Sequence, residues 1–177
     1  MHKAKRRRIL ILVDTATGWG RNIIRGIARY SREVGYWDLY VQPRGQNRDI
    51  PIPPNWMGEG IIARIASEHL LNEIKKTRLP TVNVSNLRFR HCPYPKVVSD
   101  FELIGTMAAD YLISIGFHHF AFSATEGAFA TMKPVYKSFE KCLHRSGFAC
   151  SKHLLSDARF DSEEEQNRMA QWLESHK

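Results

Sequence analysis

The chain has 177 residues, of which 43% are hydrophobic and 25% are charged, and this composition is typical of a globular domain and does not favour an intrinsically disordered chain. No apolar run approaches the length that crosses a membrane, and the basic start leads into a strand of about five residues instead of the apolar core of a signal peptide, which disfavours a periplasmic protein. The formal net charge is +8, and five positive charges lie in the first eight residues, so the rest of the chain is only mildly basic.

The basic leader, residues 1–8, contains Lys3, Lys5 and three consecutive arginines. Its ordinary interpretation is a solvated tail. The alternative is an arm that attracts nucleic-acid phosphates. An arm this short would add salt-sensitive attraction without reading bases, so it could not make a specific regulator by itself.

Residues 6–41 predict a strand, a polar loop, an amphipathic helix and a second strand. Residues 9–13 are continuously apolar, as a strand covered on both faces requires, whereas residues 14–20, apart from Trp19, are small or polar. Thr17 is the predicted cap of the helix, and Gly35 is its predicted end. Its apolar stripe comprises Ile23, Ile24, Ile27, Tyr30 and Val34. The loop therefore lies at the carboxyl end of a strand, where open parallel sheets bind ligands.

A second strand-and-helix unit follows the first. Residues 37–41 form the second strand, and residues 42–56, rich in Pro, Asn and Arg, predict a loop. Residues 60–65 predict a third buried strand, and Ser67 caps the next helix. The apolar face of that helix comprises Leu70, Leu71 and Ile74.

Three further strands and one long helix come next. The predicted strands are residues 80–84, 96–99 and 119–123. Residues 85–95 predict an irregular connection, and Asp100 caps a helix that ends at Gly116. The apolar stripe of this helix comprises Leu103, Ile104, Met107, Ala108, Tyr111, Leu112 and Ile115. Strands that alternate with helices predict an α/β fold with a doubly wound parallel sheet.

The last part of the chain is less regular. Residues 135–145 have helical spacing, residues 151–155 predict a strand, and Ser162 with Glu165 forms a capping box that opens a final helix. The apolar positions of these two helices are Tyr136, Phe139, Cys142, Leu143, Met169, Trp172 and Leu173. Only 54 residues follow Ser123, too few to build a second sheet of comparable size.

The cysteines and adjacent histidines do not predict a metal site. Cys92, Cys142 and Cys150 are odd in number and lack paired metal-ligand spacing, so neither a disulfide framework nor a zinc site is suggested. A reducing, cytoplasmic setting fits this pattern best. His118 and His119 point apart on a strand, and a structural role is favoured over metal binding.

Five segments resemble, in order, the sensor domains of the lactose-repressor family, and more closely those of bacterial xylose operon regulators. They are LVDTATGWGRNIIRGIARYSREVGY, GEGIIARI, LPTVNVSN, VVSDFELIGTMAADYLISIGFHHFAFSA and NRMAQWLES. The resemblance covers nearly the whole chain and implies a type I periplasmic-binding-protein fold, in which two Rossmann-like lobes close on a sugar. The implied parts are a basic leader at residues 1–8, a first sensor lobe at 9–123 and the start of an incomplete second lobe at 124–177.

The resemblance also implies a biological role. Lactose-repressor proteins begin with a helix-turn-helix headpiece, whereas xylose regulators carry the sensor first and an AraC-type DNA-binding domain last. Only eight residues precede the first strand, so the second arrangement fits, and the DNA-binding domain is expected beyond Lys177. The implied protein is a cytoplasmic, non-enzymatic regulator that binds xylose or a related monosaccharide, DNA and a second copy of itself. No cofactor and no metal are expected.

A sugar needs hydrogen-bond partners around its hydroxyls and an aromatic surface against its C–H face. Residues of both kinds follow the predicted strands, at the edge where the carboxyl ends of the strands meet. The candidate ligand-binding residues are Asp14, Thr15, Trp19, Arg21, Arg64, Ser85, Asn86 and Asp100. They are expected to face one crevice.

Four of these residues also have a purely structural interpretation. Trp19 could seal the helix against the sheet, and Arg21 could pair with a surface carboxylate. Asp100 could act as a helix cap alone, since capping stabilises by about 1 kcal/mol without any ligand. Asp14 could satisfy backbone donors in its own turn.

One position departs from the family pattern. An arginine that reaches the sugar often opens the first helix of the second lobe, and by register with SFEKCL this position is Val135, with Lys133 close by. The departure leaves open whether the ligand is a pentose.

Two other α/β families share the alternation of strands and helices, but this chain lacks the residues that those families need for their function. A dinucleotide-binding enzyme is one alternative, because Gly18 and Gly20 lie in the correct loop. The third glycine of that fingerprint would fall at Ile23, however, and the second strand ends without an acidic residue. A phospho-acceptor receiver domain would need an aspartate where the third strand ends at Arg64. No nucleophile elbow supports hydrolysis.

Overall fold

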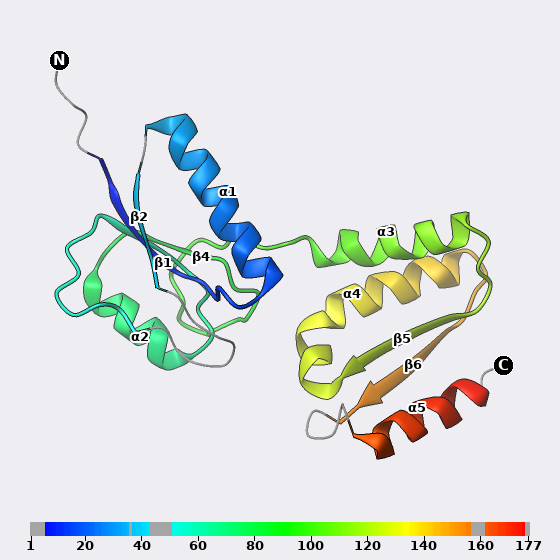
Figure 1. Cartoon of the computed structure of the whole chain (residues 1–177). Coiled ribbons are helices and arrows are strands. Elements are labelled where there is room, and N and C mark those ends of the chain that lie inside the picture. The colour runs from blue at the N-terminus through cyan, green and yellow to red at the C-terminus, as the bar shows by residue number, and fades with distance from the viewer. Residues whose placement is uncertain (1–5, 36, 43–50, 157–161, 176–177) are drawn as a thin grey trace. The chain divides into compact units, whose positions relative to one another are not determined.

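The computed structural model describes residues 6–35, 37–42, 51–156 and 162–175. The chain divides into two compact units, residues 1–98 and 99–177 (Figure 1). The first unit contains β1 (Arg8–Leu12), α1 (Gly18–Val34), β2 (Asp38–Val41), β3 (Gly60–Ala63), α2 (Glu68–Thr77) and β4 (Thr81–Asn83). The second contains α3 (Phe101–Ser114), β5 (Phe120–Thr125), α4 (Glu126–Arg145), β6 (Cys150–Leu155) and α5 (Glu163–Glu174). The lobe boundaries at 9–123 and 124–177 stay a prediction, since α3 and β5 group with the later residues.

The first unit is built on one parallel sheet in the strand order β2-β1-β3-β4. The register places Leu12 beside Ala63 and Ala63 beside Asn83, so the carboxyl ends of β1, β3 and β4 are neighbours. From β1 the chain passes through α1 to β2 on one side, and then returns to β3 and β4 on the other. The strand order therefore reverses between β1 and β3, and such a switch point is where open α/β sheets bind ligands.

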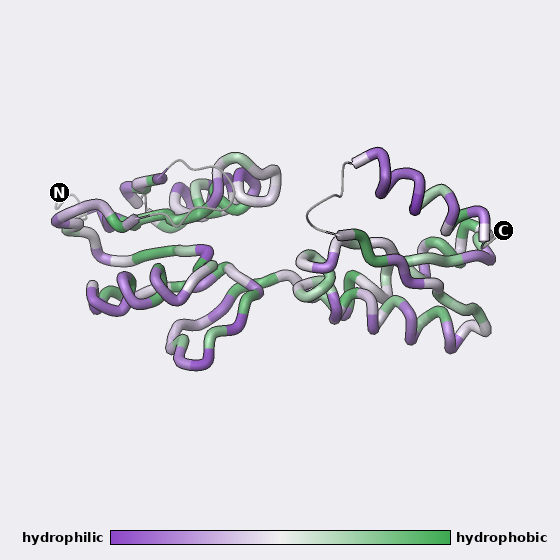
Figure 2. The backbone as a smooth tube through the Cα atoms, turned by 90° about the horizontal axis from the view of Figure 1, so that it is seen from below, coloured by the Kyte–Doolittle hydropathy of each residue, from purple (hydrophilic) through white to green (hydrophobic). Residues whose placement is uncertain are grey.

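The two faces of this sheet carry different helices, because successive side chains of a strand point to opposite faces. Leu10 and Leu12 of β1 pack in one core with the apolar residues of α2. Ile9, Ile11 and Val13 pack in a second core with the three isoleucines of α1. The last two residues of the stripe predicted for α1, Tyr30 and Val34, are 52% and 49% exposed, so that part of the prediction is wrong. Figure 2 shows hydrophobic residues concentrated along the strands of this unit. The predicted doubly wound arrangement is confirmed.

The predicted helix ends of the first unit are also confirmed. Thr17 caps α1, because its Oγ1 accepts a hydrogen bond from the Gly20 amide at 3.0 Å. Ser67 caps α2 in the same way, through the Leu70 amide at 3.0 Å. Gly35 ends α1, as expected.

The predicted strand at residues 96–99 is wrong. Lys96 makes one isolated parallel bridge to Asn83, and these four described residues contain no strand. Val97 and Val98 are 63% and 47% exposed, so the apolar pair that suggested a buried strand lies on the surface. The chain leaves the edge of the sheet after one residue, before a ladder can form.

The start of β1 includes part of the predicted leader. Arg8 is the first residue of β1, and its guanidinium lies 5.2 Å from the ring centre of Tyr40 and 5.4 Å from that of Trp56. This cation is therefore a packed side chain and not part of a solvated tail. The predicted loop at 42–56 lies partly outside the described residues, and its described part contains neither helix nor strand.

The second unit pairs β5 with β6 in a parallel two-stranded sheet, and α3 packs against α4. Its buried core comprises Ala109, Phe120, Phe139 and Leu143. The two helices are in close contact at Gly105 of α3, where a Cβ atom would lie 2.2 Å from the carbonyl oxygen of Val135 and 2.1 Å from Ser138 Oγ. Only glycine fits this contact.

The predicted core face of α3 is largely wrong, because only Ala108 and Leu112 of its stripe pack against the core of this unit. Five residues of the predicted stripe are between 41% and 63% exposed: Leu103, Ile104, Met107, Tyr111 and Ile115. The helix instead buries Gly105 and Ala109. Because α3 is apolar around most of its circumference, periodicity could not identify the packed side, and the small residues that allow close approach decide it.

The fourth helix begins nine residues before its predicted start at 135. Thr125, the last residue of β5, caps it by accepting a hydrogen bond from the Ala128 amide at 3.3 Å. Pro134 lies inside the helix, where a missing amide donor usually interrupts the pattern. The predicted strand at 151–155 and the cap at Ser162 are confirmed by β6 and α5.

Candidate functional site

The edge of the first sheet at the switch point gathers most of the candidate ligand residues. Asp14 follows β1, Arg64 follows β3, and Ser85 and Asn86 follow β4. The other candidates of this unit, Thr15, Trp19 and Arg21, belong to the loop between β1 and α1 or to the first turn of α1. These seven residues therefore lie after the neighbouring ends of three adjacent strands, with Trp19 and Arg21 in the first turn of α1.

Asp14 and Arg64 form an ion pair across the switch point. Arg64 Nη1 donates to Asp14 Oδ2 at 3.1 Å. Asp14 is only 7% exposed, whereas the Arg64 side chain is 38% exposed. A guanidinium has five N–H donors, so this contact leaves Arg64 with donors that reach solvent at the same edge. The pair is charge-balanced and remains able to bind polar groups.

Asn83, the last residue of β4, is a positioning residue that the sequence analysis missed. It is fully buried, and its Oδ1 accepts hydrogen bonds from the amide of Ile65 at 3.3 Å and from that of Ser85 at 2.8 Å. The side chain thus ties the exit of β3 to the exit of β4, next to Arg64. An asparagine between the two valines of the predicted strand was the available signal.

The two candidates after β4 take part in a turn. Ser85 is 2% exposed, and its Oγ accepts a hydrogen bond from the Leu87 amide at 3.2 Å. The carbonyl oxygens of Asn86 and Leu87 accept hydrogen bonds from Lys96 Nζ at 3.4 and 2.6 Å. The turn is therefore fixed by its own contacts, and ligand contact by these two side chains stays a prediction.

Arg21 stabilises the loop after β1. Its Nη1 donates to the carbonyl oxygens of Thr15 at 3.0 Å and of Ala16 at 2.8 Å. These contacts differ from the carboxylate pair that was the alternative interpretation of Arg21, and ligand contact by Arg21 stays a prediction. Trp19 is 42% exposed and belongs to neither apolar core of the first unit, so it does not seal α1 against the sheet. Its ring lies partly exposed on the first turn of α1.

Gly20 allows α1 to lie directly against the loop that carries Asp14. A Cβ atom at this position would lie 1.7 Å from the Asp14 carbonyl oxygen and 3.1 Å from Thr17 Oγ1. The glycine therefore serves packing between the helix and the loop. This packing contact is sufficient to explain the glycine, so Gly20 does not require a bound phosphate as its explanation.

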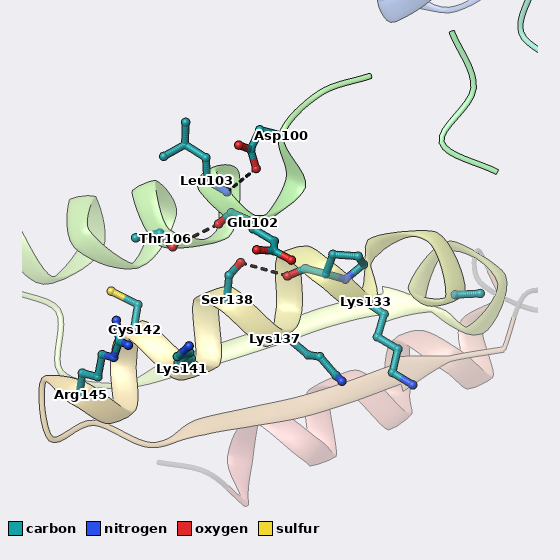
Figure 3. Close-up of a pocket in the computed structure, with 12 residues that line it drawn as sticks. Asp100, Glu102, Leu103, Thr106, Lys133, Lys137, Ser138, Lys141, Cys142 and Arg145 are labelled. Atoms are coloured by element: carbon teal, nitrogen blue, oxygen red, sulfur yellow. Dashed lines mark hydrogen bonds between the residues drawn. The ribbon is translucent and has the colours of Figure 1, made fainter. Parts of the chain in front are cut away.

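Asp100, the eighth candidate, belongs to the second unit. Its Oδ1 accepts a hydrogen bond from the Leu103 amide at 2.9 Å, so it caps α3 as its alternative interpretation predicted (Figure 3). Ligand contact by Asp100 stays a prediction.

Substitution of Asp100 separates the cap from a ligand role. Asp100→Ala is expected to lower the free energy of unfolding by about 1 kcal/mol, because the first turn of α3 loses an acceptor. Asp100→Asn keeps an acceptor oxygen and is expected to stay close to the parent protein in thermal unfolding. If Asp100→Asn lowers stability as much as Asp100→Ala does, the negative charge of Asp100 contributes to stability, and a capping oxygen alone does not explain why an aspartate occurs here.

Val135, the position where the family pattern has an arginine, is a core position. It is 6% exposed, and its carbonyl oxygen lies against Gly105. A long cationic side chain at 135 would have to leave this packed contact between α3 and α4. Lys133, its neighbour in sequence, is exposed instead.

Comparison with known proteins identifies the family. A family model described as the XylR N-terminal domain matches residues 8–101, which is more than half of the chain. The chain belongs to the XylR N-terminal domain family. The matched residues include all of the first unit's strands and both of its helices.

Individual relatives agree with this assignment to the XylR N-terminal domain family. The xylose operon regulatory protein of Escherichia coli (strain K12) is 23% identical over 185 aligned positions, which cover 97% of this chain and 45% of the relative. The solved structure of the xylose-binding transcription activator xylR has a TM-score of 0.77 at 19% identity, and covers 98% of this chain and 45% of that one. A periplasmic binding protein/LacI transcriptional regulator from Alkaliphilus metalliredigens QYMF, complexed with D-xylulofuranose, has a TM-score of 0.63 at 18% identity, covering 96% and 65%.

These comparisons confirm the predicted fold class, an α/β lobe of the type I periplasmic-binding-protein kind. The chain spans about 45% of the length of the first relatives it matches. Within the described part of the chain, no helix is both long and apolar enough to span a bilayer.

Proposed function

We propose that this chain is the effector-sensing part of a sugar-responsive, DNA-binding transcription regulator. Its membership of the XylR N-terminal domain family supports this proposal, as do the names of its relatives. The proposed regulator is cytoplasmic and non-enzymatic, acts as a homodimer, and contacts DNA through a domain outside this chain.

The observation that carries the proposal is the Asp14–Arg64 pair at the switch point. A carboxylate accepts hydrogen bonds from hydroxyls, and a guanidinium donates several in one plane, so the pair matches a ligand with neighbouring hydroxyl groups. The exposed ring of Trp19, five residues after Asp14, offers the aromatic surface that a sugar's C–H face needs. Thr15 and the residues after β4 complete the proposed wall.

The nucleotide-binding alternative has weaker support. Gly20 is explained by its contact with the Asp14 carbonyl group, and Arg21 is engaged with loop carbonyl groups. The glycine spacing that would cradle a pyrophosphate is absent from the sequence of this loop. A neutral polyol fits the charge-balanced pair better than a dinucleotide does.

Xylose or a related monosaccharide is the proposed effector, which would bind between this wall and a second lobe. Sugar binding would stabilise the closed form of the two lobes and so shift the population of dimers competent to bind DNA.

A thermal-shift screen of the full-length gene product tests this proposal. Any ligand that binds only the folded state stabilises by about 2.7 kcal/mol when present at a hundred times its dissociation constant. We expect at least one pentose or hexose to raise the melting temperature in a saturable way. A shift with nicotinamide cofactors and none with sugars would favour the enzyme alternative.

A further inference from the structure

One face of α4 carries a row of four cations. Lys133, Lys137, Lys141 and Arg145 recur at every fourth residue, and all four are exposed. Residues four apart on an α-helix share a face and are about 6 Å apart along its axis, so the row extends over about 18 Å. The four side chains line a groove of about 810 Å³ between α3 and α4 (Figure 3).

This row is not a consequence of a generally basic unit. Residues 99–177 contain eight Lys and Arg against eleven Asp and Glu, so half of the cations of an acidic segment fall on this one face. In the described part of the chain, none of the four forms an ion pair. The acidic residues of the groove, Asp100 and Glu102, belong to α3, and Figure 3 shows the side chains of Lys133 and Lys137 extending side by side away from α3.

The length of the row favours an extended polyanion over a small anion. A small phosphorylated ligand would reach only part of a row this long, whereas a DNA strand presents a phosphate about every 3.4 Å along the duplex axis. Lysine binds phosphate as a point charge without fixed geometry, which suits contact that does not depend on base sequence.

An anionic membrane fits the same face less well. Helices that lie on membranes carry large apolar anchors beside their cations. The neutral residues that share the groove-lining face of α4 are Ala130, Pro134, Ser138 and Cys142, which are all small, and the large apolar residue of the groove, Leu103, belongs to α3 and not to the helix that carries the cations. The charge pattern therefore matches a nucleic-acid backbone better than a lipid surface.

We propose that α4 binds the phosphate backbone of duplex DNA through Lys133, Lys137, Lys141 and Arg145, without reading bases. This contact gives the second unit a salt-sensitive attraction to DNA of its own. It does not depend on sugar binding, so failure of the sugar proposal would leave it intact.

The salt dependence of DNA binding tests this proposal. The 177-residue chain is titrated into a short labelled duplex of arbitrary sequence, and affinity is measured by fluorescence anisotropy between about 50 and 200 mM salt. Log affinity falls with log salt by about 0.9 per phosphate contacted, so replacing the four cations by Gln is expected to reduce the slope by about 3 to 4. The matched control removes four exposed arginines outside α4 by substitution to Gln: Arg25, Arg32, Arg78 and Arg90.

Three outcomes would overturn the proposal: an unchanged slope in the α4 variant, an equal loss of slope in the control, or binding to phosphatidylserine vesicles with none to DNA. A variant that keeps the charges, with Arg at Lys133, Lys137 and Lys141, is expected to keep the slope. If circular dichroism shows that the fourfold variant is unfolded, Lys137→Gln with Lys141→Gln replaces it, with half the expected change.

Discussion

Gly20→Ala is expected to lower the free energy of unfolding of the first unit by about 3 kcal/mol, the upper end of the usual cost of overpacking. The new Cβ would lie 1.7 Å from the Asp14 carbonyl oxygen, which is a backbone atom and cannot rotate away. Relief requires α1 or the loop to shift, and a shift of the loop would move the Asp14 carboxylate relative to Arg64. Urea denaturation followed by tryptophan fluorescence measures the change, since three of the four tryptophans lie in this unit.

Gly26→Ala is the matched control in the same helix. A Cβ at Gly26 would meet no atom within 4 Å, so alanine adds no clash. Because glycine is disfavoured inside helices, the substitution is expected to stabilise the unit by about 0.5–1 kcal/mol. If both substitutions change the midpoint in the same direction, the close approach of α1 to the Asp14 loop is not the reason for the effect.

Arg64→Ala is expected to destabilise the first unit by about 2 kcal/mol, because it leaves the buried Asp14 carboxylate without its ion-pair partner. The partial exposure of the Arg64 side chain keeps the cost below that of breaking a fully buried pair. Chemical denaturation measures this cost. Arg90→Ala, which removes an exposed arginine elsewhere in the unit, is expected to change stability by less than about 0.5 kcal/mol.

A double-mutant cycle identifies the interaction itself. Asp14→Ala in the Arg64→Ala background removes the orphaned carboxylate, so the double variant is expected to be less destabilised than the sum of the two single variants by about 1–2 kcal/mol. Additive losses would mean that the two side chains do not stabilise one another, in conflict with their 3.1 Å contact.

Local signals in the sequence predicted the first unit well. The apolar run at 9–13 located β1, and the spacing of apolar residues with Thr17 and Gly35 located α1. These signals are reliable because both faces of the sheet are covered and each helix has one apolar side. The same reasoning placed Asp14 and Arg64 at neighbouring strand ends, although it could not show that they pair.

The predictions from the sequence were wrong where contacts between distant parts of the chain override the local pattern of apolar residues. The packed side of α3 is determined by Gly105 and Ala109, and their role appears only when α4 lies against them. The apolar pair at residues 97 and 98 is typical of a strand, but only Lys96 forms a bridge to the edge strand of the sheet, at Asn83. Asn83 was missed because its side chain links Ser85, two residues later in the chain, to Ile65, which is 18 residues earlier, by accepting a hydrogen bond from each backbone amide.

Contacts within the protein hold the proposed sugar site in place. Asn83 holds the exits of β3 and β4 together, and Arg21 and Gly20 fix the loop after β1. The pair at the switch point is therefore held by contacts that do not involve the ligand. A rigid, preorganised wall of this kind loses little conformational entropy on binding, which favours affinity for a small polar ligand.

Calorimetric titration of the full-length gene product with xylose and related monosaccharides tests the central claim most directly. We predict saturable binding of at least one of these sugars, weakened about tenfold or more by Arg64→Ala, since losing a hydrogen bond to a charged group costs about 1.5–3 kcal/mol. Arg90→Ala is expected to leave the affinity unchanged. Absence of saturable binding by every sugar, or equal affinity in the parent protein and Arg64→Ala, would contradict the assignment of this edge as a sugar site.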